Sequence, residues 1–140
     1  MINLCVLDTT IASFLVNKNP IIAPYIPHLI GATPILCFQT AGEMRYGALK
    51  SHWGQKRKQI LEHFLQDTEI IHSDDNLTQI WADLMHQSHR IGRRLEAGDC
   101  WIAAAAMRLN APLLTHDKDF DMKAFPSITV VCYAQQSPAI

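Results

Sequence analysis

The chain has 140 residues, of which 49% are hydrophobic and 18% charged, with a formal net charge of −1. This composition excludes a disordered chain, and the length predicts a single domain, 1–140, with a substantial core. No apolar run approaches the roughly 18 residues of a membrane helix, and the N-terminal stretch carries Asp8 but no basic leader. We therefore expect a globular protein without a membrane segment or signal peptide.

The four cysteines, Cys5, Cys37, Cys100 and Cys132, are far apart in the sequence. No pair has the spacing of a zinc site or of a small disulfide scaffold. Three of the four, all except Cys100, lie in apolar strand-like runs, where a free cysteine behaves as a small buried hydrophobe. We expect a reduced, cytoplasmic protein.

Short apolar runs alternate with helix-like periods along the chain. In chain order we predict strand Ile2–Leu7, helix Ile11–Val16, helix Pro20–Ile30, strand Pro34–Phe38, helix Thr40–Leu49, helix Trp53–Leu65, strand Glu69–His72, helix Leu77–His89, loop Arg90–Gly98, helix Asp99–Leu109, strand Pro112–Thr115 and strand Ile128–Tyr133. This alternation predicts an α/β fold with a mainly parallel sheet and helices on both of its faces.

Side chains near the helix starts and on apolar faces refine this plan. Thr9 or Thr10 is expected to cap the first helix, and Asp74 or Asp75 the helix Leu77–His89. The run Ala103–Ala106 permits close approach of its helix to the sheet. Tryptophans 53, 81 and 101 fall at apolar helix positions, which favours packing over base stacking.

Four acidic residues stand where one element gives way to the next. Asp8 ends the first strand, Asp117 follows a later strand, and Glu43 and Asp99 lie at the starts of helices. Ligands of open α/β sheets bind at the carboxyl ends of the strands. Like charges gathered there repel by roughly 4 kcal/mol per pair at 4 Å and an effective dielectric near 20. A divalent cation between the carboxylates would relieve that repulsion, so we predict a metal site.

Each acid also has a local structural alternative. Asp8 is a good helix cap, and Thr40 with Glu43 fits a capping box. A first-turn Asp99 is favoured by the helix dipole, and Asp117 suits a turn. The joint placement of the four therefore carries the prediction, more than any one of them.

The charge balance is compatible with a nucleic-acid partner once these acids are set aside. Nine other acids then face twelve bases. The bases gather in two clusters that are candidates for phosphate binding: Lys50, Lys56, Arg57 and Lys58, and then Arg90, Arg93 and Arg94. Solvated helix faces are the alternative. His86 and His89 share a helix face, but no third ligand at a zinc-like spacing accompanies them.

Four short motifs in order resemble PIN-domain ribonucleases, most closely the VapC type, the toxins of bacterial toxin–antitoxin pairs. The motifs are Leu7-Asp8-Thr9, Thr40-Ala41-Gly42-Glu43, Gly98-Asp99-Cys100-Trp101-Ile102-Ala103-Ala104 and Leu114-Thr115-His116-Asp117-Lys118-Asp119-Phe120. They cover nearly the whole chain, from Leu4 to about Val131. Thr10 is a modest departure, since the family often has Asn or Ser there.

The resemblance implies a single-domain three-layer α/β/α fold that binds Mg²⁺ or Mn²⁺ and cuts single-stranded or looped RNA (tRNA, rRNA or mRNA). It matches Asp8, Glu43, Asp99 and Asp117 to the family's catalytic acids and metal ligands, with Asp119 as a candidate accessory ligand. Thr115 matches the hydroxyl beside the last acid. It also implies a VapB-like antitoxin with a DNA-binding end and a homodimer. Substrate phosphates would meet side chains near the acids, for which the candidates are Thr9, Thr115, Arg90, Arg93, Arg94 and Lys118.

Other functions remain open from the sequence. A PIN-type nuclease that processes housekeeping RNA or trims structured DNA would need the same acids. A non-catalytic binding module would not need converging charges. A phosphotransfer domain also has an Asp-Thr after its first strand, but Asp117 before Lys118 fits a metal site better.

Overall fold

The structure, a computed structural model, describes residues 2–118, 120, 125 and 127–134. Its strands are β1 (Leu4–Leu7), β2 (Thr33–Cys37), β3 (Glu69–Ile71), β4 (Leu113–Leu114) and β5 (Val130–Val131). Its helices are α1 (Thr9–Asn17), the 3₁₀ helix η1 (Pro20–Tyr25), α2 (Ile26–Leu29), α3 (Phe38–Lys50), α4 (Gln55–Asp67), α5 (Asp75–Arg90) and α6 (Ala97–Leu109).

Within the described residues, five strands form one sheet in the order β3-β2-β1-β4-β5. Every pairing is parallel, and Val6 of the central strand β1 lies opposite Ile35 of β2 and Leu113 of β4. The carboxyl ends of the strands therefore meet at one edge of the sheet. The predicted α/β fold with a parallel sheet is confirmed.

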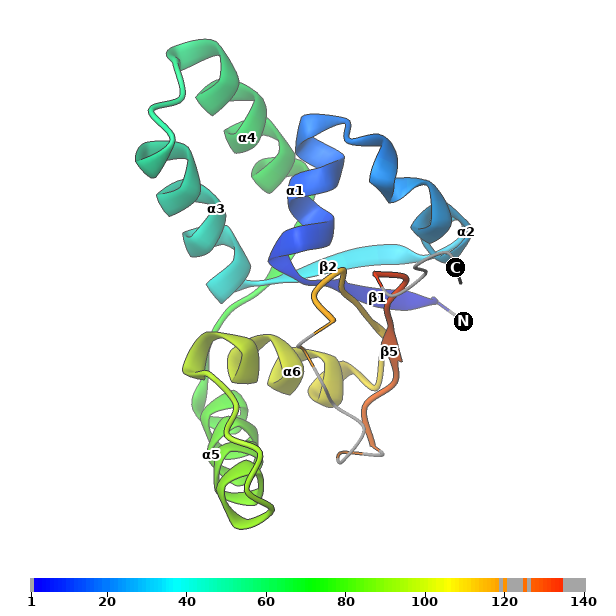
Figure 1. Cartoon of the computed structure of the whole chain (residues 1–140), viewed down its shortest axis with the longest axis vertical. Helices are drawn as coiled ribbons and strands as arrows, with labels where there is room; N and C mark the ends of the chain where they lie inside the picture. Colours follow the sequence, from blue (N-terminus) through cyan, green and yellow to red (C-terminus); the bar gives the residue numbers. More distant parts are fainter. Residues whose placement is uncertain (1, 119, 121–124, 126, 135–140) are drawn as a thin grey trace, which may run out of the picture.

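Alternate residues of the central strands supply the two cores on either side of the sheet. Val6, Ile35 and Leu113 pack with α5 and α6, whereas Leu7, Leu36 and Leu114 pack with the helices of the other face. Figure 1 shows the resulting three layers, with α1 to α4 on one side of the sheet and α5 and α6 on the other. Each fully buried aliphatic side chain contributes roughly 1.5–3 kcal/mol to folding.

Several element boundaries differ from the prediction. The expected helix Pro20–Ile30 is a 3₁₀ helix followed by one turn of α-helix, because Pro24 within it provides no N–H for an α-helical bond. Trp53 precedes α4, whose N-cap is Gly54. The loop expected at Arg90–Gly98 is shorter, since Arg90 ends α5 and α6 begins at Ala97.

Small residues bring α6 close to its neighbours. Ala103, Ala104 and Ala105 are fully buried, which confirms the expected close approach of this helix to the sheet. Gly98 in its first turn lies against α3, where an added Cβ would meet Nε2 of Gln39 at 2.8 Å. The start of α6, with Asp99, is thereby held beside the helix that carries Glu43.

Other expectations about side chains are also confirmed. Asp74 caps α5 by accepting a hydrogen bond of 2.8 Å from the Leu77 amide. The rings of Trp81 and Trp101 stack with centroids 5.1 Å apart, so both are packing residues. All four cysteines are free thiols. No helix in the described part of the chain is long and apolar enough to cross a membrane.

Candidate active site

Asp8 lies between the end of β1 and the start of α1, and its side chain is 3% exposed. Its Oδ1 accepts hydrogen bonds from the Ile11 amide at 3.1 Å and from the Thr10 hydroxyl at 2.6 Å. Asp8 is therefore the N-cap of α1, and the prediction that Thr9 or Thr10 caps this helix is wrong. The reason is that Asp8 is the single residue between β1, which ends at Leu7, and α1, which begins at Thr9, so Asp8 occupies the capping position.

Thr115 ties the carboxylate of Asp8 to the segment that carries Asp117. Its hydroxyl donates to Oδ2 of Asp8 and accepts from the Asp117 amide at 3.0 Å. The amide of His116 donates to the Thr10 hydroxyl at 2.9 Å, which adds a second link between the two segments. These bonds align the end of β4 with the end of β1, so Asp8 and Asp117 share one edge of the sheet.

Burial raises the pKa of Asp8 above its ordinary value, and the hydrogen bonds from Thr10, Thr115 and Ile11 oppose that rise. The negative charge of Asp117 raises the pKa further. The carboxylate is thus a desolvated anion held by three donors, with a like charge nearby.

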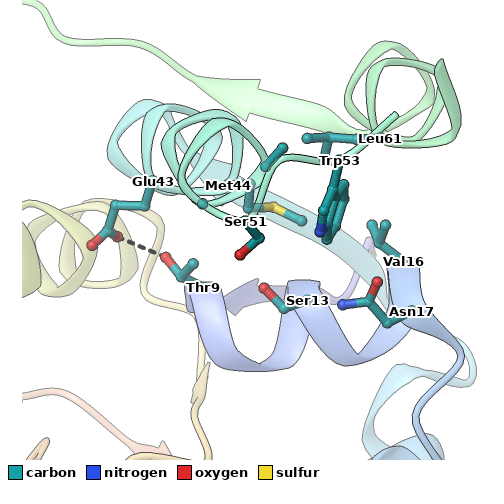
Figure 2. Close-up of a pocket in the computed structure, with 11 residues that line it drawn as sticks. Thr9, Ser13, Val16, Asn17, Glu43, Met44, Ser51, Trp53 and Leu61 are labelled. Atoms are coloured by element: carbon teal, nitrogen blue, oxygen red, sulfur yellow. Dashed lines mark hydrogen bonds between the residues drawn. The ribbon is translucent and has the colours of Figure 1, made fainter. Parts of the chain in front are cut away.

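Glu43 lies in the second turn of α3, where its Oε1 accepts a hydrogen bond of 2.7 Å from the Thr9 hydroxyl (Figure 2). The predicted capping box of Thr40 and Glu43 is wrong, because α3 begins at Phe38 and its N-cap, Cys37, makes no side-chain capping bond. Glu43 consequently has no capping role. Thr9 fixes the carboxylate of Glu43 next to the segment that contains Asp8.

The negative charges of the other three predicted acids all affect the pKa of Asp99. Its pKa is raised from the ordinary 3.8 to about 6. Burial is the largest cause, followed by the negative charges of Glu96, Asp117, Glu43 and Asp8. The structure therefore brings Asp8, Glu43 and Asp117 within electrostatic reach of Asp99.

Glu96 belongs to this acidic region and was missed by the sequence reasoning. It occupies the N-cap position of α6 without making a side-chain capping bond, and it is the foremost charged neighbour of Asp99. The signal that could have found it is its spacing, three residues before Asp99 at the start of a helix, which puts both side chains on one face. The predicted loop Arg90–Gly98 includes Glu96, so the helix start at Ala97 is not evident from the sequence.

The predicted acids lie near Asp99, but their side chains are not already arranged to coordinate a metal ion. Among the described residues, no three or more His, Cys, Asp or Glu side chains are arranged to hold a metal ion. Asp119, the candidate accessory ligand, lies outside the described residues. The donor chemistry nevertheless suits Mg²⁺ or Mn²⁺, since the groups are carboxylates whose mutual repulsion raises the pKa of Asp99. The metal site remains a prediction.

The predicted RNA-binding residues are distributed unevenly around the acids. Thr9 and Thr115 bond directly to Glu43 and Asp8, and Lys118 is exposed in the turn after Asp117. The helix α5, which ends at Arg90, extends away from the sheet (Figure 1). Arg93 and Arg94 are exposed in the loop that follows. The structure does not bring Arg90 to the acids, and the roles of these bases in RNA binding remain predictions.

Tyr25 holds the segment after β4 in place through hydrogen bonds, a role that the sequence did not reveal. Its fully buried hydroxyl donates to the Thr115 carbonyl at 2.9 Å and accepts from the Tyr133 amide at 2.9 Å. It also lies 2.7 Å from Nδ1 of His116. Because a phenol has one proton, already donated to Thr115, His116 must be the donor at Nδ1.

Replacing Asp99 with Asn is predicted to stabilise the metal-free fold above pH 6. The folded protein disfavours the charged form of Asp99, so it binds more protons than the unfolded chain between pH 3.8 and about 6. The wild type therefore loses stability as the pH rises through this window, because Asp99 becomes charged. The Asp99→Asn protein has no charge to form there and keeps that stability. We expect an advantage of roughly 1–2 kcal/mol, allowing for solvent screening.

Urea unfolding with chelator, measured across this pH range, tests the prediction. Asp83→Asn, an exposed acid on α5, serves as the control and should change stability little at any pH. An advantage of Asp99→Asn that stayed constant from low to neutral pH would contradict the assigned cause.

Tyr25→Phe is predicted to destabilise the protein by about 1–3 kcal/mol, because the Thr115 carbonyl loses its donor and the Tyr133 amide its acceptor. Urea unfolding and faster hydrogen exchange of the Tyr133 amide measure this effect. Tyr133→Phe is the matched control, since its hydroxyl contacts His28 instead. Equal loss of stability and unchanged amide exchange in both variants would refute the role of Tyr25.

Comparison with known proteins identifies the family. The PIN domain family matches residues 5–126. The chain is 31% identical over 117 residues to ribonuclease VapC5 of Mycobacterium tuberculosis, covering 82% of this chain and 84% of the relative. It is 27% identical over 125 residues to ribonuclease VapC1 of Haemophilus influenzae, covering 88% of this chain and 90% of that protein.

Solved structures agree on the fold. VapBC2 from Rickettsia felis, bound to a promoter DNA fragment, matches with a TM-score of 0.78 and 24% identity over 92% of this chain and 98% of that chain. DNA-bound VapBC from Salmonella typhimurium matches with a TM-score of 0.79 and 21% identity over 94% and 98% of the two chains. The family match over residues 5–126 and the 31% identity to a VapC ribonuclease show that the chain belongs to the PIN domain family and is of the VapC type.

Proposed function

We propose that the protein is a Mg²⁺- or Mn²⁺-dependent endoribonuclease that acts as the toxin of a toxin–antitoxin pair. The observation that carries the proposal is the convergence of charge on Asp99, whose pKa is raised by Glu96, Asp117, Glu43 and Asp8 together. Such uncompensated repulsion is what a divalent cation relieves, and perturbed acids in one place are typical of functional sites. The relatives named as VapC ribonucleases support the choice of RNA as substrate.

Asp8, Asp99 and Asp117 are the residues we assign to hold the cation, with Glu43 beside them. When bound, the ion would neutralise phosphate charge and make a water easier to deprotonate.

The remaining side chains prepare the site for this role. Thr10, Thr115 and the Ile11 amide orient the Asp8 carboxylate before any cation arrives. Thr9 fixes Oε1 of Glu43, and we assign to Oε2 the role of accepting a proton from the attacking water or orienting it. The bonds to Thr115 hold the backbone of Asp117 in register with Asp8.

The structural neighbours are complexes of VapC-type proteins with antitoxins, some bound to promoter DNA. We therefore assign this chain a VapB-like antitoxin partner with a DNA-binding end, and a homodimeric state within that complex. Growth arrest on expression, relieved by a small protein from a neighbouring gene, would support the toxin role. A protein with the same nuclease activity that did not slow growth would favour RNA processing instead.

Replacing Asp8 or Asp99 with Asn is predicted to reduce RNA cleavage by about 100-fold or more, the scale on which loss of one preorganised electrostatic contact acts. Chelator should abolish wild-type cleavage, and Mn²⁺ or Mg²⁺ should restore it. Cleavage of a labelled RNA under single-turnover conditions measures both effects. Because Asp99→Asn is expected to be at least as stable as the wild type, unfolding would not explain its loss of activity.

Asp83→Asn again provides the control and should retain wild-type activity, since Asp83 is exposed on α5 and is not among the charges that raise the pKa of Asp8 or Asp99. The proposal would be refuted by wild-type cleavage rates in either active-site variant. Calorimetry adds an independent readout, because a protein that binds no Mn²⁺ at millimolar concentration would be a non-catalytic binding module.

A further inference from the structure

A pocket of about 240 Å³ lies between α1, α3 and the start of α4, immediately beside Glu43. Figure 2 shows Thr9, Ser13 and Asn17 of α1 along one side, opposite Met44, Ser51 and Trp53. Its volume is below the roughly 300–1,000 Å³ of pockets for drug-sized ligands. It therefore suits a single ring system better than a larger ligand.

The α1 wall of this pocket is mainly polar and the opposite wall mainly apolar, with Val16 and Ser51 as the exceptions. Thr9, Ser13 and Asn17 are four residues apart along α1, so they form one helical stripe of neutral hydrogen-bonding groups. Met44, Trp53 and Leu61 provide the apolar surface opposite. Helix faces that pack on each other are usually apolar, which makes a polar stripe facing a pocket informative. A flat ring with polar edges matches both walls.

One end of the pocket is continuous with the acidic site. Thr9 lines the pocket and donates to Glu43 at 2.7 Å, and Glu43 is itself a lining residue. Because the carboxylate repels anions, a phosphate group is disfavoured inside the pocket, whereas a neutral ring is not.

The opposite end of the pocket is basic. The Arg57 guanidinium lies 3.9 Å from the centre of the Trp53 ring and donates to Oδ1 of Asn17 at 3.0 Å. Lys56 and Lys58 flank Arg57 at the N-terminus of α4, where Gly54 supplies no side-chain cap to the first-turn amides. Cationic side chains and uncapped helix amides both favour a phosphate at this end.

We propose that this pocket binds one base of the RNA strand, adjacent to the phosphodiester that is cut. The inference rests on the proposed nuclease function, which it extends to a base-binding subsite. The strand would place one phosphate at the acidic edge, a base between the two walls, and a following phosphate at the basic end. The Ser13 hydroxyl and the Asn17 amide contact the polar edges of the base, and the half-buried Trp53 contacts its apolar surface, whereas the buried Met44 and Leu61 close the pocket.

The glycines of α3 allow the pocket to be filled without disturbing the helix. Gly47 lines the pocket, and a Cβ added there would meet nothing within 4 Å. Gly47→Leu introduces a good helix former whose side chain occupies the space. Gly42→Leu is the matched control, because Gly42 is on the same helix, is equally open to a Cβ and does not line the pocket.

The experiment compares cleavage of a short single-stranded RNA of mixed sequence with cleavage of versions that each lack one base. For wild type and Gly42→Leu, removing the base at one position near the cut should lower kcat/KM by about 10-fold, within the range that base–aromatic contacts produce. Gly47→Leu should cut the intact RNA about 10-fold more slowly and should lose nothing further when that base is removed. Thermal unfolding verifies that both variants are folded.

The proposal would be overturned if, at every position of the RNA, removing the base slowed cleavage by Gly47→Leu as much as it slows cleavage by the wild type. Binding of the same RNAs, followed by fluorescence anisotropy, separates this failure from failure of the proposed function. A wild-type protein that binds the RNAs but cuts none refutes the nuclease function, and the binding data then decide on the pocket by the same comparison. Should Gly47→Leu leave RNA recognition intact but prevent binding of the co-expressed antitoxin, the pocket would belong to a protein partner and the proposal would be wrong.

Discussion

The buried carboxylate of Asp8 is the constraint on which the rest of the site depends. A carboxylate that is 3% exposed is stable only where donors replace the lost water, and here two hydroxyls and one amide do so. Those donors come from both α1 and the segment after β4. Satisfying one buried anion therefore sets the register between two segments about a hundred residues apart, and Asp117 is placed as a consequence.

Asp99 differs from Asp8 in that no hydrogen bond is among the influences on its pKa, whereas burial and neighbouring negative charges disfavour its charged form. Its pKa is raised because it is partly buried among other acids, and α6 approaches α3 closely through Gly98. The same approach that packs the alanines of α6 on the sheet thus concentrates negative charge at its edge. Proteins commonly accept such local instability at functional sites. A cation would convert this unfavourable repulsion into attraction.

Glu43 connects the acidic edge of the sheet to the pocket between α1 and α3, because it belongs to both. Thr9 is common to both, since it bonds to the carboxylate and lines the pocket. The two basic clusters in the sequence are separated by this geometry. The cluster at the start of α4 lies at the pocket, whereas Arg90 is at the C-terminal end of α5. The cluster at the start of α4 could therefore hold a strand that has one phosphate at the acids and a base in the pocket.

The order of strands and helices, the parallel sheet and the placement of Asp8, Asp99 and Asp117 near element ends were predictable from the sequence. Each depends on local periodicity or on the rule that parallel strands end at one edge. The starts of α3 at Phe38 and of α6 at Ala97, and with them the N-cap position of Glu96, were not predicted, because helix starts depend on where packing ends each element. The support from Tyr25 and the pocket beside Gly47 were decided by the tertiary structure, since hydrogen bonds between residues 90 apart and space between helices leave no local pattern in the chain.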